Sequence, residues 1–265
     1  MVSQFEKKKI LIVVMTYPIP SRSYTETICT AGLTKDGEWV RLYPIDYRYL
    51  DSSKQFRKYQ WIEVELGPRN NEKDKRLESR RPKIESISLF GEPISTKNNW
   101  SERKHYIDKS PVRTLNELKV LYDENRVSLG IVQPSIVHDI KIESVSPRWK
   151  PSQENALSQL KLFGPQPKPL TKIPYKFSYV FECNDSKKTH NAMIEDWELG
   201  VLFLKEVDRL GSQEKAAASV RNKFLNDICS KEKDTKFFMG TTFPFNSWVV
   251  LGLFYPKAEE QLSLF

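Results

Sequence analysis

A histidine and three carboxylates gather in the segment "HNAMIEDWE", residues 190–198. The candidate catalytic residues in it are His190, Glu195, Asp196 and Glu198. Such groups can perform general acid–base catalysis or hold a divalent cation through oxygen ligands. Glu195 and Glu198 share a face if the segment opens a helix. The alternative is that these acids only favour the first turn of a helix, where the helix dipole attracts negative charge.

Two further carboxylates, Glu26 and Asp46, are candidate catalytic residues beside strands that are rich in aromatic and basic side chains. The candidate nucleic-acid-binding residues of this region are Arg22, Tyr24, Trp39, Arg41, Tyr43, Arg48 and Trp61. Aromatic rings can stack on bases while arginines contact phosphates, and either carboxylate could then lie under an extruded base. The alternative is that the aromatic residues belong to the hydrophobic core.

A basic segment, residues 67–83, carries seven cationic and three acidic side chains. It adds Arg76, Arg80 and Arg81 to the candidate nucleic-acid-binding residues. Its polarity predicts an exposed loop, and phosphate contacts from it would make the affinity fall steeply with salt. The net charge of the whole chain, +8, also suits a polyanionic partner. The alternative is a loop that is only solvated.

The composition excludes several classes of protein. The chain has 265 residues, and no apolar stretch in it approaches the roughly 20 residues that span a bilayer. With no signal peptide evident at the N-terminus, we expect a cytoplasmic protein without a membrane partner. Three cysteines without a CxxC pair predict neither a disulfide framework nor a zinc site of the usual spacing. Nucleotide-binding and hydrolase motifs are absent from the sequence, so we expect no nucleotide cofactor, and Mg²⁺ only if the protein is a nuclease.

The elements that must position these residues are mostly strands in the first half. Apolar and β-branched runs predict strands at residues 9–17, 24–34, 38–45, 59–66, 84–90 and 135–145. The Asp-Gly pair in "KDGE" predicts a hairpin between the second and third of these strands. Thr114 and Glu117 predict a capping box at the start of a helix that ends near Asn125. By analogy with nucleic-acid-binding barrels, we expect a small barrel-like unit.

The second half follows a proline-rich segment, residues 162–174, which predicts an extended linker. Strands at 175–183 and 190–194, helices at 195–210 and 213–229, and strands at 235–242 and 247–255 then predict an antiparallel ββααββ unit. The fold class is therefore α+β. The predicted domains are a mostly-β nucleic-acid-binding domain at 1–161, the linker, an α+β domain at 175–256 and an exposed tail at 257–265.

The last five residues read "QLSLF" after the charged spacer "KAEE". They are Gln261, Leu262, Ser263, Leu264 and Phe265. An extended peptide of this kind can place its leucine and phenylalanine in an apolar pocket while the glutamine hydrogen bonds at the rim. At all five positions the segment resembles the peptide that binds the bacterial sliding clamp, the beta subunit of DNA polymerase III. The alternative is a tail that packs back onto the core.

The resemblance implies a bacterial or phage protein that is tethered to DNA near replication or repair. Our leading hypothesis is a clamp-tethered DNA-processing enzyme of DNA repair or anti-phage defence. It would excise a modified or damaged base as a DNA glycosylase, or cleave a strand as a nuclease. The alternatives are a non-catalytic adaptor or modified-base reader that binds DNA and the clamp, and an RNA-binding protein whose tail is coincidental.

Overall fold

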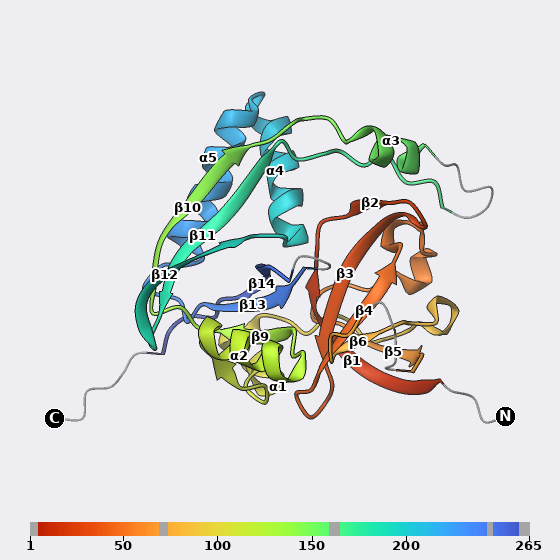
Figure 1. The fold of residues 1–265 in the computed structure, drawn as a ribbon, viewed down its shortest axis with the longest axis horizontal. Coiled ribbons are helices and arrows are strands. Elements are labelled where there is room, and N and C mark those ends of the chain that lie inside the picture. The colour runs from red at the N-terminus through yellow and green to blue at the C-terminus, as the bar shows by residue number, and fades with distance from the viewer. Residues whose placement is uncertain (1–4, 69–73, 159–164, 243–245, 260–265) are drawn as a thin grey trace.

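The computed structural model describes residues 5–68, 74–158, 165–242 and 246–259. These residues form three sheets with helices packed around them (Figure 1). This confirms the α+β class and the mostly-β character of the N-terminal part. Among the described residues, no helix combines the length and the apolar character that a membrane crossing requires.

The N-terminal sheet has the strand order β6-β4-β3-β1-β5-β7, and β2 adds to β3. Its strands are β1 (Glu6–Met15), β2 (Ile19–Ser21), β3 (Thr25–Leu33), β4 (Trp39–Ile45), β5 (Trp61–Leu66), β6 (Ser79–Arg80) and β7 (Ser88–Phe90). Short 3-10 helices lie at Tyr47–Tyr49, Ser52–Lys54 and Ile84–Ser86. The predicted hairpin joins β3 to β4, and Gly37 supplies the positive φ of +86° that its turn requires.

The expected barrel does not close within the described residues. β6 and β7 are the two ends of the sheet order, and among the described strands β6 pairs with β4 alone. A single bridge between Leu66 and Pro82, with the hydrogen bond from Gly67 N to Arg81 O of 2.9 Å, brings the residues after β6 back to the end of β5. The sheet is therefore strongly curled around its own apolar core but remains open.

A second sheet, with the order β14-β13-β9-β8, lies in the middle of the molecule. Its strands are β8 (Val112–Arg113), β9 (Leu129–Val132), β13 (Lys236–Thr241) and β14 (Trp248–Phe254). Helices α1 (Lys97–Ile107) and α2 (Leu115–Asn125) precede β8 and β9. The predicted capping box of α2 is confirmed, because the Thr114 hydroxyl accepts from Glu117 N at 3.2 Å and the Glu117 carboxylate accepts from Thr114 N at 2.7 Å.

The third sheet has the order β10-β11-β12 and packs with two helices. Its strands are β10 (Ile136–Ser144), β11 (Tyr175–Cys183) and β12 (Ser186–Met193), and the helices are α4 (Trp197–Leu210) and α5 (Gln213–Asn222). A π-helical turn, Lys223–Asp227, continues α5, and the short helix α3 (Pro151–Leu157) lies apart beside β2. The predicted order ββααββ is thus confirmed, but its two strand pairs belong to different sheets.

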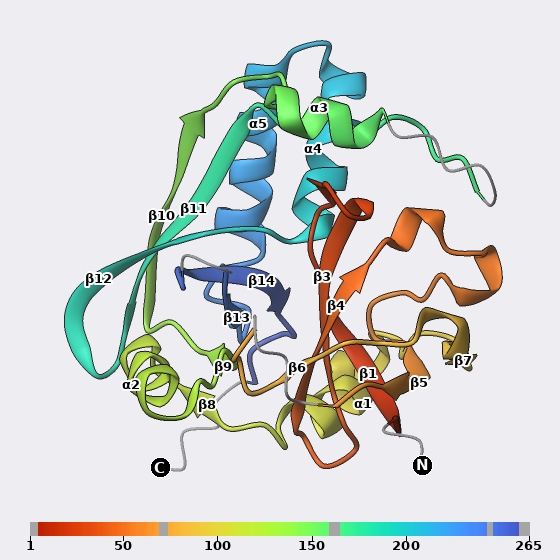
Figure 2. The ribbon, with the colours of Figure 1, turned by 45° about the vertical axis from the view of Figure 1, so that its right-hand side comes forward.

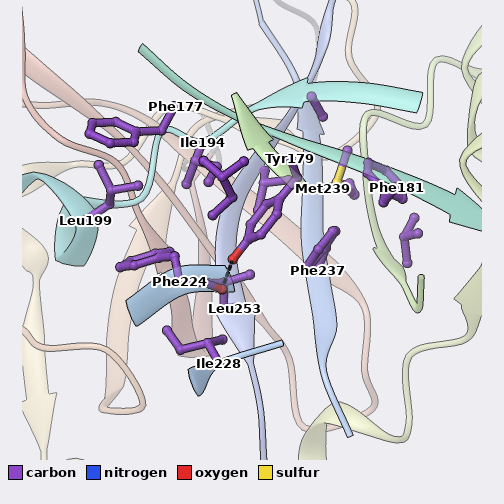
Figure 3. Packing of buried hydrophobic residues seen from close by; sticks show 14 of the residues in the cluster. Phe177, Tyr179, Phe181, Ile194, Leu199, Phe224, Ile228, Phe237, Met239 and Leu253 are labelled. Carbon is purple, nitrogen blue, oxygen red and sulfur yellow. Dashed lines mark hydrogen bonds between the residues drawn. The ribbon is translucent and has the colours of Figure 1, made fainter. Parts of the chain in front are cut away.

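Two apolar cores hold the three sheets together. One core joins the N-terminal sheet to the middle sheet through residues such as Leu11, Val13 and Phe238. The other fills the space between the middle sheet, the third sheet and helices α4 and α5, where Tyr179 stacks on Phe237 at 4.6 Å between ring centroids (Figure 3). The buried Tyr179 hydroxyl donates to the Phe224 carbonyl at 2.9 Å, so this core leaves that polar group satisfied.

The strand pairings cross the predicted domain boundaries. β10 precedes the proline-rich segment and β11 follows it, yet the two strands are paired from Ile136 to Ser144. β9 likewise pairs with β13, more than a hundred residues later in the chain. Residues 165–174 of the predicted linker therefore belong to a connection between neighbouring strands, and residues 162–164 lie outside the described part.

The prediction of an exposed loop at residues 67–83 is wrong for its second half. Arg76, Glu78 and Arg80 are buried. The Glu78 carboxylate accepts from Ser128 N at 2.9 Å, and the Arg80 guanidinium donates to the Gly67 carbonyl at 2.8 Å. These charged groups pack because the fold supplies partners that the local sequence does not contain. Residues 69–73 lie outside the described part.

Candidate functional site

A pocket of about 430 Å³ lies where the end of β1, the loop before β5 and the start of α4 meet. Its lining residues are Met15, Tyr47, Phe56, Arg57, Lys58, Pro93, Trp197 and Glu198. We call it the aromatic pocket. A backbone bridge between Thr16 and Asp196 and the hydrogen bond from Tyr17 N to Glu195 O at 3.0 Å fasten α4 to the strand end.

The close approach of α4 to β1 depends on a glycine. A Cβ atom at Gly200 would lie 2.3 Å from the ring of Tyr17, so no larger residue fits there without a shift. Tyr17 in turn contacts Trp197, with 6.4 Å between the ring centroids. The first turn of α4 is thereby held against the N-terminal sheet, and this contact sets one wall of the aromatic pocket.

Three aromatic rings form the apolar wall of the pocket. Tyr47 packs edge-on against Phe56 at 5.1 Å and against Trp197 at 5.4 Å between ring centroids. The Tyr47 hydroxyl donates to the Phe56 carbonyl, and burial raises the pKa of Tyr47 to about 12. The ring is therefore neutral at physiological pH. Such a wall can hold a planar apolar or aromatic group by stacking.

The polar side of the pocket is an acid–lysine cluster, which consists of Lys58, Asp196 and Glu198. Lys58 Nζ lies 2.7 and 2.9 Å from the two carboxylate oxygens of Asp196 and 3.2 Å from Glu198 Oε2. The side chains of Lys58 and Asp196 are only 10% and 1% exposed, whereas Glu198 is 57% exposed. Asp196 also caps α4, because it accepts from Glu198 N at 2.9 Å.

The pKa values of the cluster follow from burial and mutual attraction. Burial works against the charge of Lys58, but the carboxylates of Asp196 and Glu198 outweigh it and raise the pKa of Lys58. Burial raises the pKa of Asp196, and the Lys58 ammonium opposes that rise. Lys58 is thus an ammonium at physiological pH. The three acceptors around Nζ match its three N–H groups, so the cluster presents the positive charge of Lys58 and the exposed carboxylate of Glu198 to the pocket.

The predicted acid cluster at residues 190–198 is only partly brought together. Asp196 and Glu198 lie at the aromatic pocket, whereas His190 precedes them by roughly 20 Å of extended strand and is buried among other residues. Burial lowers the pKa of His190. Burial also raises the pKa of Glu195, the Arg41 guanidinium opposes this rise, and Glu195 does not line the aromatic pocket. His190 and Glu195 therefore do not share a site with Asp196 and Glu198.

Glu26 forms a buried ion pair instead of standing alone. Its two carboxylate oxygens each lie 2.6 Å from the Arg48 guanidinium, which also donates to the Lys168 carbonyl at 2.9 Å. Arg48 thereby ties the curled sheet to the segment before β11. Asp46 is the residue before the 3-10 helix at Tyr47–Tyr49 and is half-buried. Neither carboxylate lines the aromatic pocket.

Several predicted nucleic-acid-binding residues are part of the core. Trp39 packs edge-on against Phe238 at 5.8 Å, and Trp61 packs edge-on against Tyr106 at 5.1 Å between ring centroids. Arg41 is 1% exposed and donates to Ser128 O at 3.0 Å. Arg41 is therefore closed to a phosphate, whereas Trp39 and Trp61 are half-buried and their rings pack mainly within the fold.

The exposed residues of the predicted set lie at the surface of the N-terminal sheet. They are Arg22, Tyr43 and Arg81, while Tyr24 is half-buried and accepts from the Arg81 guanidinium at 3.4 Å. Arg76 and Arg80 are buried, as described above. The exposed arginines can contact phosphates; the buried ones act within the fold. The predicted partner-binding residues, Gln261 to Phe265, lie outside the described residues.

Sequence reasoning missed Lys58, Tyr47, Phe56 and Trp197. Tyr47 follows Asp46, Trp197 follows Asp196, and Phe56 and Lys58 lie just before the predicted strand at 59–66. The available signal for Lys58 was its place directly before the predicted strand at 59–66, which would bring the lysine close to the core. No local signal pairs it with an aspartate 138 residues later.

Comparison with protein families divides the chain between α1 and β8. Residues 6–109 match the family described as Domain of unknown function (DUF8758), and residues 112–265 match the family described as Domain of unknown function (DUF8757). The boundary between the two matches differs from the predicted boundary at residues 162–174. A search of the curated proteins finds no match.

Proposed function

We propose that this chain, which belongs to the family described as Domain of unknown function (DUF8757), is a DNA-processing enzyme that excises a single base. The observation that supports this proposal is the aromatic pocket, which joins stacking rings to the Lys58 ammonium and the Glu198 carboxylate. An enzyme that acts on a base must first take it out of the duplex or act on a single strand. The pocket offers the extruded base a place to bind.

The size and lining of the pocket suit one nucleobase. Its volume of about 430 Å³ falls in the range of small-molecule sites. A base stacked on Trp197 or Tyr47 would gain on the order of 1–3 kcal/mol of binding free energy, as at other single-strand sites. Arg57 is a well-exposed cation in the lining, and it is available to a neighbouring phosphate once its contact with Glu92 opens.

Base excision assigns different roles to the members of the acid–lysine cluster. The exposed Glu198 carboxylate accepts a proton from a water molecule, whose oxygen forms a bond to the sugar carbon C1′. The glycosidic bond breaks, and the base leaves with the bonding electron pair. The Lys58 ammonium stabilises the negative charge on the leaving base, which then takes up, through solvent, the proton that Glu198 accepted, so the carboxylate is restored. Asp196 holds Lys58 in place and keeps it charged.

The place of action is proposed from the sequence alone. The C-terminal QLSLF segment resembles the clamp-binding peptide, so we propose a tether to the bacterial sliding clamp in the cytoplasm. The tether would raise the local concentration of the protein at DNA without adding base specificity. Repair and anti-phage defence both fit such an arrangement.

The test is an incubation of the full chain with plain and base-modified DNA, single-stranded and duplex, followed by neutral and alkaline denaturing gels. We expect breaks that need alkali, because excision leaves an abasic site. Glu198→Gln should slow the reaction by about 100-fold or more. Glu214→Gln is the matched control, because Glu214 occupies the same position in the first turn of α5 and is exposed. Equal activity of the two variants would refute the role of Glu198.

A second candidate is a non-catalytic reader of modified bases. The observation that favours it is that Lys58 and Asp196 satisfy one another and Asp196 also caps α4, as purely structural groups would. Intact DNA in all lanes, together with binding that depends on Trp197, would select the reader. Direct breaks that need Mg²⁺ would instead select the nuclease, and preference for RNA with no affinity for the clamp would select the RNA-binding alternative.

A further inference from the structure

Three side chains of metal-binding type meet at the turn between β11 and β12. They are Cys183 at the end of β11, Asp185 in the turn and His190 on β12. One ligand atom from each of them lies within 4.8 Å of those of the other two. It is the one group of three such side chains found within the described residues. The hairpin makes this possible because Cys183 pairs with Ser186 and Phe181 with His190 across the two strands.

His190 gives an independent indication of a ligand-binding site. The residue is only 4% exposed, and its Nε2 atom is buried without a hydrogen-bond partner. A buried polar atom without a partner costs free energy, so native proteins almost always satisfy it. Cys183 is also buried, whereas Asp185 is exposed. An ion could therefore enter from the side of Asp185 and bind the two buried groups.

The surroundings hold the carboxylate ligand in place. Asn116 of α2 donates through Nδ2 to Asp185 Oδ2 at 3.0 Å. The side chain of Thr114, which also caps α2, forms a further hydrogen bond with Asp185. Such outer partners are typical of metal-binding side chains. Figure 2 shows the β11–β12 turn reaching down beside α2, so the group lies at a junction between the hairpin and the first turn of that helix.

We propose that Cys183, Asp185 and His190 bind one Zn²⁺ ion, with the fourth position open to water. A thiolate, an imidazole and a carboxylate are all zinc ligands, and the sulfur favours zinc over Mg²⁺ or Ca²⁺. Zinc bonds of about 2.0–2.3 Å place tetrahedral ligand atoms roughly 3.3–3.8 Å apart. The ligand atoms lie within 4.8 Å of one another, so side-chain movements of about 1 Å would reach that geometry.

The site would fasten the hairpin to α2 and lies apart from the aromatic pocket, with which it shares no residue. The sequence expectation of no zinc site rested on the absence of a CxxC pair. Here the spacing is Cys-x-Asp followed by a more distant His, and only the turn of the hairpin brings these residues together. Lys119 of α2 places a positive charge near both Cys183 and His190. A Zn²⁺ ion bound by one thiolate and one carboxylate is neutral overall, so this charge does not oppose its binding.

The test uses the full chain, freed of metal with a chelator. We expect one Zn²⁺ per chain by competition with a colorimetric chelator, and a rise in Tm of several degrees when zinc is added. With Co²⁺ as the probe, tetrahedral binding should give strong visible absorption and a thiolate-to-cobalt band in the near ultraviolet. Absence of that band, or zinc binding weaker than about 10 µM (roughly 7 kcal/mol of binding free energy), would overturn the proposal.

Variants separate the site from general effects on folding. Asp185→Asn keeps the shape of an exposed side chain and should weaken zinc binding by about 100-fold. Cys183→Ala should remove the thiolate band, whereas Cys229→Ala, which changes a cysteine outside the group, should leave it unchanged. If Asp185→Asn and the unchanged chain have the same zinc affinity and the same cobalt spectrum, the assignment is refuted. Because Asp185 is exposed, this test requires no substitution in the core.

Discussion

The buried ion pair of Lys58 and Asp196 can be tested by a double-mutant cycle. Lys58→Met keeps the aliphatic stem of the lysine but leaves the Asp196 carboxylate buried without its counter-charge. Because these side chains are 10% and 1% exposed, we expect Lys58→Met to lower the free energy of unfolding by about 3–5 kcal/mol. Asp196→Asn removes the charge and retains a side chain that can cap α4, so the helix end is preserved.

The two changes together should cost less than the sum of their separate costs. The double variant leaves neither an unpaired ammonium nor an unpaired carboxylate in the interior, so we expect a coupling energy of about 2–3 kcal/mol. Glu198 is 3.2 Å from Lys58, but it is exposed and keeps its solvation when Lys58 is removed. It should therefore contribute little to this coupling.

The pH dependence of the stability of Lys58→Met provides a check on the electrostatic origin of this cost. Burial raises the pKa of Asp196, and removal of Lys58 takes away the cation that opposes this rise. A carboxyl group whose pKa is higher in the folded than in the unfolded state destabilises the folded protein while it is ionised. This destabilisation is lost as the pH falls through the folded-state pKa and the group takes up a proton. The deficit of Lys58→Met should therefore shrink as the pH falls from 7 towards 4.

Urea unfolding followed by circular dichroism is the assay, with equal m-values required of all variants. The control is Lys223 and Asp227, an exposed pair at 3.1 Å whose cycle should give a coupling of about 0.5 kcal/mol or less. A coupling for Lys58 and Asp196 no larger than that of the exposed pair would refute our account of a buried, mutually dependent cluster.

Four further predictions follow from the described contacts and the C-terminal sequence. Trp197→Leu should weaken binding of single-stranded DNA by about 10-fold or more, measured by fluorescence anisotropy, because one stacking surface is lost; unchanged affinity would place the base elsewhere. Arg80→Ala should lower the free energy of unfolding by about 1–3 kcal/mol because the Gly67 carbonyl loses its donor. The control Arg81→Ala changes an exposed side chain and should alter the free energy of unfolding by no more than about 0.5 kcal/mol. Equal losses for the two variants in urea unfolding would contradict the burial of Arg80. Since burial raises the pKa of Cys229 to about 11, iodoacetamide should modify it far more slowly in the native protein at pH 8 than in urea, as followed by peptide mass spectrometry; similar rates would mean that the thiol is accessible and ionised. Removal of residues 261–265 should abolish binding of the bacterial sliding clamp in calorimetry and leave Tm unchanged; retained binding would end the tether proposal.

Local interactions allowed the sequence to predict most of the secondary structure. The hairpin turn at Gly37 and the capping box at Thr114 each depend on residues within one turn of one another. The long strands were also predictable, because their apolar runs are a property of the local sequence and do not depend on which strand each one pairs with. The α+β class followed from these elements in order.

The sequence could not specify which side chains the fold would bury. Trp39 and Arg41 looked like a binding surface, but Phe238 and Ser128 cover them from distant parts of the chain. Arg80 looked like a loop residue, but Gly67 supplies an acceptor for it. A charge becomes tolerable in the interior only where the tertiary structure provides its partner.

The sequence by itself predicted most of the long strands, the helices α2, α4 and α5, the excess of positive charge and the clamp-like tail, but neither α1 nor α3. Only the tertiary structure decided the sheet order, the open form of the N-terminal sheet and both candidate sites. The aromatic pocket combines Met15 with Glu198, and the proposed zinc ligands meet through the register of one hairpin. The physical reason is that secondary structure depends on near neighbours, whereas a site depends on packing between residues that are distant in the chain or set by strand register.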